Sequence, residues 1–218
     1  MGSLTRKFAN NFTTGGVYKP AAITNNSLAN ITDIPAAAKG KLTLISSQTA
    51  SASASIEFTS GIDSTYHTYL FKFVNIHPSV DSAGITFQMD ISGASNYNTT
   101  MTTTMFQSYH NEGDTNTILS YRTDSDQAQG TAFQEICLDI GNDNDQCCNG
   151  NLYIFSPSST VYVKHFISRF ARIGGADYAG DQFYAGYFNT TSALTKIKFQ
   201  MTSGNIDAGT IYMYGIGA

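Results

Sequence analysis

Residues 205–217 read N-I-D-A-G-T-I-Y-M-Y-G-I-G, an alternation of apolar and aromatic side chains that decides the fold class. A period of two is typical of a β-strand with one buried face, so Ile211 and Met213 are expected to face a core. Tyr212 and Tyr214 are then expected to point outward, where a partner could bind them. Because an unpaired apolar strand edge promotes aggregation, we expect this segment to complete a compact β domain.

The same period recurs through residues 41–218. Within residues 85–91, ITFQMDI, the odd-numbered apolar residues are expected to face the core and the even-numbered polar residues to face solvent. Further strands are expected at 42–46, 55–59, 66–76, 102–109, 133–140, 152–155, 161–170, 183–188, 197–201 and 210–216. Turn-forming clusters, such as His77-Pro78 and residues 141–145, separate them. With no amphipathic helix between the strands, the pattern predicts an all-β fold: one antiparallel β-sandwich domain, residues 41–218, with jelly-roll-like strand order.

Residues 1–40 have a different pattern. Isolated apolar side chains stand among turn-forming residues, and no period of 2 or 3.6 persists. Such a segment cannot bury a core of its own, so we expect an extended N-terminal arm that docks on a partner subunit or on the domain's own surface. Phe8, Phe12 and Val17 are the expected anchors on a partner. The alternative is an unordered terminus.

Composition excludes several classes of function. Charged residues make up 13% of the chain and the formal net charge is −4, which argues against nucleic acid as a partner, because phosphate binding needs clustered Lys and Arg. No apolar run approaches the roughly 20 residues of a membrane span. Residues 1–20 lack the apolar core of a signal peptide, so we expect synthesis in a cytoplasm. The odd number of cysteines (Cys137, Cys147 and Cys148) then predicts free thiols.

The titratable residues form no catalytic signature. No G-x-S-x-G or comparable motif accompanies the histidines, so structural or surface roles are expected for His67, His77, His110 and His165. Glu57 and Glu135 could supply the paired carboxylates of a glycosidase, but no motif points to that pair. We therefore expect no enzyme and no catalytic residue.

Metal sites have equally weak support. The oxygen-rich residues 139–145 could hold calcium, but they lack the frame of an EF-hand, and Asn and Asp also form ordinary turns. Adjacent Cys147 and Cys148 suit neither a shared tetrahedral zinc site nor an unstrained disulfide. No metal and no cofactor are expected.

Aromatic residues are abundant, with 13 tyrosines, 14 phenylalanines and no tryptophan. Exposed rings could stack on the pyranose rings of a glycan, whereas strand propensity and core or subunit packing explain the same residues equally well. The tyrosines considered for glycan contact are Tyr153, Tyr178, Tyr184, Tyr187, Tyr212 and Tyr214.

Several stretches of turn and strand sequence resemble a group of virion structural proteins of tailed phages that infect cyanobacteria and other aquatic bacteria. The stretches are residues 3–11 (SLTRKFANN), 56–66 (IEFTSGIDSTY), 69–78 (YLFKFVNIHP), 141–145 (GNDND), 156–160 (SPSST), 186–191 (GYFNTT) and 203–210 (SGNIDAGT). The Cys147-Cys148 pair departs from the group's pattern. No catalytic residues come with the resemblance.

The resemblance implies a virion component made in the host cytoplasm. Our leading expectation is a capsid decoration, or cement, protein that binds the major capsid protein on the outer face of the head as a homo-oligomer, in our expectation a trimer. The alternative is a tail-associated fibre or receptor-binding module that recognises a host surface glycan. A polysaccharide depolymerase acting through paired carboxylates is a third, weaker possibility.

Overall fold

A computed structural model describes residues 42–217 of the chain. The expected arm at residues 1–40, with Phe8, Phe12 and Val17, lies outside the described residues. From 42 to 217 the chain folds into strands and contains no helix. Nothing in that range could therefore cross a membrane as an apolar helix.

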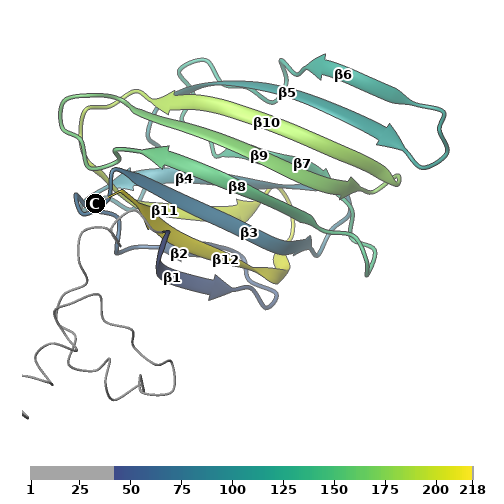
Figure 1. Cartoon of the computed structure of the whole chain (residues 1–218), viewed down its shortest axis with the longest axis horizontal. Coiled ribbons are helices and arrows are strands. Elements are labelled where there is room, and N and C mark those ends of the chain that lie inside the picture. The colour runs from purple at the N-terminus through teal and green to yellow at the C-terminus, as the bar shows by residue number, and fades with distance from the viewer. Residues whose placement is uncertain (1–41, 218) are drawn as a thin grey trace, which may run out of the picture. The chain divides into compact units, whose positions relative to one another are not determined.

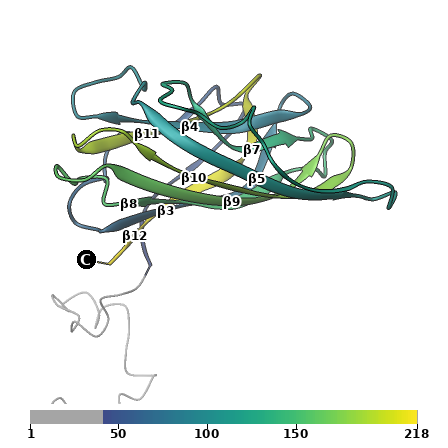
Figure 2. The same ribbon diagram turned by 90° about the horizontal axis from the view of Figure 1, so that it is seen from above.

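The strands form two antiparallel sheets, which confirms the expected all-β sandwich (Figure 1). Figure 2 shows the sheets as two layers, with β4 and β7 in one and β8 and β9 in the other. The strands are β1 (Thr43–Thr49), β2 (Ile56–Phe58), β3 (Thr68–Pro78), β4 (Ala83–Ile91), β5 (Met101–Asn111), β6 (Thr117–Tyr121), β7 (Gln134–Ile140), β8 (Cys148–Phe155), β9 (Lys164–Gly174), β10 (Tyr178–Phe188), β11 (Leu194–Met201) and β12 (Ile206–Ile216). One sheet has eight strands in the order β1-β12-β3-β8-β9-β10-β5-β6, and the other has four in the order β2-β11-β4-β7.

Eight of these strands pair in a nested way. β1 pairs with β12, β2 with β11, β3 with β8 and β4 with β7, so that the first and last strands enclose all the others. Two further hairpins, β5–β6 and β9–β10, are inserted after β4 and after β8. Both join the larger sheet beyond β8, and their addition makes it twice as wide as its partner.

An apolar core lies between the sheets, rich in phenylalanine. Phe73 of β3 contacts Phe199 of β11 at a ring-centroid distance of 5.1 Å, and Phe87 of β4 contacts Phe166 of β9 at 5.0 Å. Each fully buried ring of this kind stabilises the fold by about 1.5–3 kcal/mol relative to an exposed one. These contacts join the two sheets across the sandwich.

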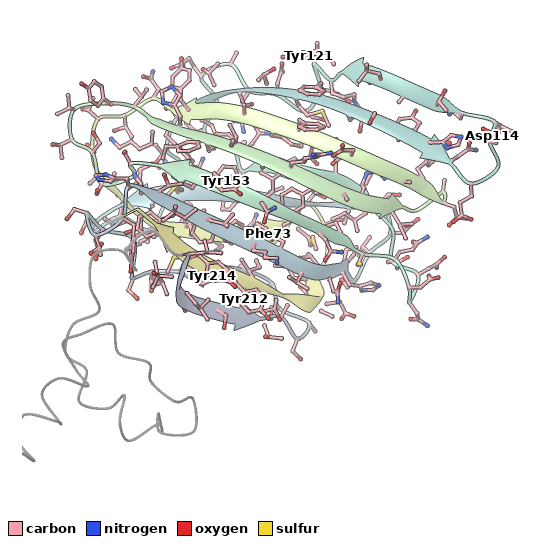
Figure 3. All side chains as sticks on the ribbon, in the orientation of Figure 1. Phe73, Asp114, Tyr121, Tyr153, Tyr212 and Tyr214 are labelled. Atoms are coloured by element: carbon pink, nitrogen blue, oxygen red, sulfur yellow. The ribbon has the colours of Figure 1, made fainter. Side chains whose placement is uncertain are left out.

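Strand β12 has the alternation expected from its sequence. Ile211 and Met213 are fully buried in the core. Tyr212 and Tyr214 lie on the opposite side of the strand and are partly exposed (Figure 3). The prediction of the inward and outward faces of this strand is confirmed.

Strand β4 differs from its prediction. Ile85, Phe87 and Met89 face the core as expected, but Ile91, at the end of the strand, is 39% exposed. Thr86, Gln88 and Asp90 are buried as well. The amide nitrogen of Gln88 donates to the carbonyl oxygens of Thr99 (3.1 Å) and Thr131 (3.2 Å), which belong to the segments before β5 and before β7. The expected solvent exposure was wrong because these segments cover the four-stranded sheet. A second difference is that β3 continues through His77 and Pro78, where a turn was expected.

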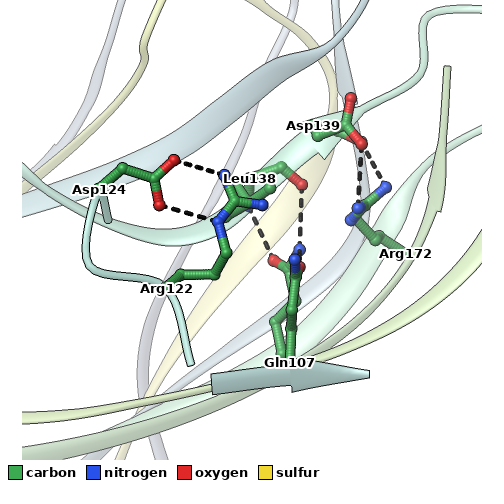
Figure 4. Close-up of polar contacts among 7 residues, drawn as sticks. Gln107, Arg122, Asp124, Leu138, Asp139 and Arg172 are labelled. Carbon is green, nitrogen blue, oxygen red and sulfur yellow. Dashed lines mark hydrogen bonds and ion pairs between the residues drawn. The ribbon is translucent and has the colours of Figure 1, made fainter. Parts of the chain in front are cut away.

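The added hairpins are fastened to β7 through polar contacts (Figure 4). The side-chain oxygen of Gln182, on β10, accepts from the N–H of Leu138 at 2.8 Å, and its nitrogen donates to Gln107 of β5 at 3.1 Å. The guanidinium of Arg172, on β9, donates to the Asp139 carbonyl at 2.7 Å and pairs with the Asp139 carboxylate at 3.0 Å. Gln107, Gln182 and Arg172 are all buried. Hydrogen bonds therefore fix the position of the widened part of the larger sheet over β7.

Replacing Gln182 tests this attachment. Gln182→Ala is expected to lower the free energy of unfolding by about 1–3 kcal/mol, because the buried N–H of Leu138 loses its acceptor. Urea denaturation measures the change. Gln200→Ala is the matched control, because that half-buried side chain makes no hydrogen bond with any described residue; it is expected to stay within about 0.5 kcal/mol of the parent. Equal losses in the two variants would contradict a specific role for Gln182.

Candidate functional site on the eight-stranded sheet

The two sheets differ in what covers their outward sides. Loop segments bury the outward side chains of β4, whereas the outward side of the eight-stranded sheet carries exposed apolar residues. Phe106 on β5 is 46% exposed, Ile167 on β9 is 47% exposed and Tyr121 on β6 is 52% exposed. We call this side, which points away from the core, the outer face. Figure 3 shows the outer face toward the viewer, with Tyr153, Tyr212 and Tyr214 labelled.

Strand register aligns a row of side chains across the outer face. The row consists of Tyr121, Phe106, Phe183, Arg169, Asn151, Lys72 and Tyr212. We call it the central row. The rings of Phe106 and Phe183 stack at 4.7 Å with an interplanar angle of 6°, and the guanidinium carbon of Arg169 lies 4.8 Å from the centroid of Phe183. The middle of the row is therefore preorganised by direct contacts.

Arg169 is held by a second interaction. Its Nε donates to Oδ1 of Asp181 at 3.0 Å and its Nη2 donates to Oδ2 at 2.8 Å. This bidentate hydrogen bonding to Asp181 raises the pKa of Arg169 above its ordinary value. Because the guanidinium contacts both an aromatic face and a carboxylate, its position on the outer face is well defined.

Two shallow hollows lie side by side at the central row. One, of about 460 Å³, is lined by Thr104, Phe106, Tyr153, Ile167 and Phe183 and is mainly apolar. Another, of about 650 Å³, is lined by Lys72, Val74, Asn149, Ala171 and Asp181 and is more polar. Asn151 and Arg169 line both hollows. The outer face thus offers an apolar and a polar contact region separated by a fixed cation.

Several aromatic rings on this surface already have ring or cation neighbours. Phe183 lies between Phe106 and Arg169, and the rings of Tyr212 and Tyr214 lie 6.3 Å apart at 28°. A sugar ring stacks on a free aromatic face, so Phe183, with a neighbour on each side, is poorly available to a sugar, whereas Tyr212 and Tyr214 each have one ring neighbour. Of the tyrosines considered for glycan contact that lie on this face, Tyr153 is the one with no ring partner among residues 42–217.

Of the other tyrosines considered for glycan contact, Tyr187 lies on the outer face, whereas Tyr178 and Tyr184 lie on the opposite side of β10. Tyr178 packs edge-on against Tyr109 at 4.9 Å, and Tyr187 lies 6.1 Å from the ring of His165. Tyr184 is buried in the core, so its choice as an exposed candidate was wrong. Burial also raises the pKa of its hydroxyl. Of the expected partner-binding residues that the structure describes, Tyr212 belongs to the central row and Tyr214 lies beside it.

The carboxylates considered for glycosidase chemistry are not brought together. Glu57 lies on β2 and Glu135 on β7, at opposite edges of the four-stranded sheet. Three strand spacings separate them, or about 14 Å, against the roughly 5–9.5 Å of a glycosidase pair. Glu57 also pairs with Lys198 at 3.0 Å and accepts a hydrogen bond from Tyr97 at 3.0 Å.

The residues considered for metal binding have other partners. Within the described range no group of three or more His, Cys, Asp or Glu side chains could hold a metal ion. In the 139–145 segment, the Asp139 carboxylate pairs with Arg172 at 3.0 Å, and the Asp143 carbonyl lies 3.2 Å from Nε2 of His77.

The three cysteines are free thiols. Cys137 and Cys148 are buried, and Cys147 is partly exposed. Burial, together with a hydrogen bond to Cys137, raises the pKa of the Cys148 thiol, which keeps it protonated and unreactive.

Phe106, Phe183 and Arg169 were not identified from the sequence. In β9, residues such as Ile167 and Ile173 point outward while Phe166 and Phe170 point inward, so both faces of the strand carry apolar side chains. Alternation alone then does not show which face meets the core. Knowledge of the strand order would have been needed to place these three residues in one row.

Comparison of the chain with protein-family models, with curated proteins and with solved structures finds no match. The geometry of the outer face is therefore the basis on which a function can be argued.

Glu135 gives the domain a pH-dependent stability. Burial, with a further contribution from the charge of Asp124, raises the pKa of Glu135 above its ordinary value of 4.5. The folded state then binds more protons than the unfolded state just above pH 4.5, so stability falls as the pH rises through that window. Glu135→Gln removes the buried charge. The variant is expected to unfold at a higher temperature than the parent at pH 7 and at the same temperature near pH 4.

Thermal unfolding followed by circular dichroism at the two pH values measures this difference. Glu112→Gln, in the exposed turn after β5, is the control and is expected to leave the unfolding temperature unchanged. A gain of equal size at both pH values would show that the effect of Glu135→Gln comes from packing and not from ionisation.

Proposed function

We propose that this chain is a structural protein of a tailed-phage virion, and specifically a capsid decoration protein that binds the outside of the head. The observation that carries the proposal is the outer face, a broad uncovered sheet surface with a preorganised row of aromatic, cationic and amide side chains. A rigid surface of this size, without a cluster of reactive groups, suits binding to another protein more than catalysis.

The topology supports the same proposal. The nested pairing of β1 with β12, β2 with β11, β3 with β8 and β4 with β7 corresponds to jelly-roll order, an architecture found in viral capsid and lectin domains. This support is an analogy between folds. The outer face is a separate line of support, because half of its strands (β5, β6, β9 and β10) belong to the inserted hairpins and not to the nested pattern.

In this function the outer face docks on the major capsid protein. Phe106, Ile167 and Tyr153 supply apolar contact area, while Arg169 and Asn151 supply directed hydrogen bonds at the centre of the patch. Residues 1–40, with Phe8, Phe12 and Val17, would add a second attachment along neighbouring subunits. Many copies of a modest interface, arranged as homo-oligomers, would together stabilise the shell. The protein would be made in the host cytoplasm and would reside in the virion.

A tail-associated module that binds a host glycan is the second candidate. One observation favours it: the ring of Tyr153 has no ring partner within residues 42–217, and it lines the hollow of about 460 Å³. The contacts of Phe183 with both Phe106 and Arg169 leave that ring little free face for a sugar, which supports capsid docking over glycan stacking.

Charge reversal on the outer face tests the docking. Arg169→Glu is expected to weaken binding to capsids that lack this protein by at least about tenfold, equivalent to about 1.4 kcal/mol, because a fixed cation at the centre of the patch becomes an anion. Co-sedimentation of the purified protein with such capsids measures the affinity. Val161→Glu, a residue 68% exposed between β8 and β9, is the control and is expected to bind like the parent.

Counting copies per virion distinguishes the two candidates. Hundreds of copies per virion would support head decoration. A handful of copies per virion, together with capsid binding by Arg169→Glu equal to that of the parent, would contradict head decoration.

Removing the N-terminal segment tests the second attachment. Deletion of residues 1–35 is expected to weaken capsid binding strongly, because one of the two attachments is lost, while the β-sandwich stays folded because the deleted residues precede β1. Circular dichroism checks the fold and co-sedimentation checks binding. Full binding by a folded deletion variant would show that the outer face is sufficient and that Phe8, Phe12 and Val17 are not anchors.

A further inference from the structure

The four outermost strands of the two sheets are not equally protected against pairing with another strand. Sheet edges are usually protected by shortness, bulges, charges or proline. β2 has three residues, the register of β1 with β12 shifts between Leu44 and Ser46, and the register of β7 with β4 shifts on both sides of Ile85. β6 has none of these devices. It pairs with β5 in unbroken register, and its residues Thr117–Tyr121 include no charge and no proline.

The free side of β6 presents backbone groups in a regular order. Arg122 donates its N–H to the Met105 carbonyl, and Asn111 donates its N–H to the Asn116 carbonyl, so the even-numbered residues direct their backbone groups toward β5. Neighbouring residues of a strand direct these groups to opposite sides. Thr117, Leu119 and Tyr121 therefore direct their N–H and C=O groups away from the sheet, and no other described strand pairs with them.

Apolar side chains flank this free edge on both faces. Leu119, 78% exposed, and Tyr121, 52% exposed, lie on the outer face, and Ile118, 38% exposed, lies on the opposite face. A strand that joined this edge would cover apolar surface on both sides of the sheet as well as pairing the backbone groups. Tyr121 also ends the central row, so the outer face reaches the edge without interruption.

We propose that β6 pairs with β6 of a second copy of this chain, antiparallel, around a two-fold axis at Leu119. Leu119 then lies opposite Leu119 of the second copy, and Thr117 lies opposite Tyr121. In this register each outward N–H of Thr117, Leu119 and Tyr121 can donate a hydrogen bond to an outward C=O of the second copy. The two eight-stranded sheets become one continuous sheet, and the two outer faces lie on the same side of it.

A second copy fits this edge better than an arbitrary peptide. The strand is uncharged over Thr117–Tyr121, so an identical strand meets it without repulsion between like charges. The outward residues Thr117, Leu119 and Tyr121 are also spaced symmetrically about Leu119, so that one two-fold operation satisfies both strands. This inference does not rest on the proposed function. It pairs copies two by two, and a trimer would need a different contact.

A lysine at the centre of the edge tests the pairing. For the full chain, sedimentation equilibrium is expected to give a weight-average mass that rises with concentration toward twice 23.5 kDa. Leu119→Lys is expected to raise the dimer dissociation constant at least tenfold, because the two-fold axis would bring two ammonium groups together. Tyr162→Lys, at a residue 74% exposed outside any strand, adds the same charge and is expected to leave the dimer unchanged.

Amide hydrogen exchange of the unaltered protein gives a second readout that does not depend on a variant. The amides of Thr117, Leu119 and Tyr121 are expected to exchange more slowly as concentration rises, while those of Ile118 and Ser120, bonded to β5, stay protected throughout. Monomers at every concentration would overturn the proposal, as would a dimer or trimer that persists equally in Leu119→Lys. Exchange at Leu119 that is independent of concentration would overturn it as well.

Discussion

The unequal width of the two sheets is the constraint on which the rest of the structure depends. A four-stranded sheet can cover only part of an eight-stranded one, so β9, β10, β5 and β6 need another way to bury their inner sides. β9 and β10 still place Phe166, Phe170 and Phe188 in the core. Farther out, hydrogen-bonded glutamine and arginine side chains attach the hairpins to β7. The same width gives the outer face its area and leaves β6 as an edge far from the core.

The alternation of apolar and polar residues correctly predicted which side chains are buried in strands that have one side against the core and the other in solvent. β12 is such a strand, and its buried Ile211 and Met213 were placed correctly. Alternation failed where both sides are apolar or both are covered. Tyr184 was considered for glycan contact, but its neighbour Phe183 is equally aromatic, so alternation does not show which of the two is buried. Gln88 was expected in solvent because the sequence does not show which segments fold over β4.

The strand β6 was not predicted at all. Its adjacent Ile118 and Leu119 break a period of two, and its five residues lie between turn-forming segments. The central row could not be predicted from the sequence for a related reason. Its residues come from strands far apart in the chain, and only the register between those strands aligns them. Local patterns therefore gave the class of fold, whereas strand order determined the candidate site.

The position of β12 between β1 and β3 has a consequence for how the chain folds. These two strands cannot become neighbours of each other, and the gap between them is filled by residues about 160 positions after β1. Closing so long a loop costs entropy before any pairing energy is gained, which places the fold among slow-folding, non-local topologies. Until Ile206–Ile216 inserts, β1 has no partner strand and one side of β3 stays open. The hairpins β5–β6 and β9–β10, by contrast, can form from local contacts before the nested strands close.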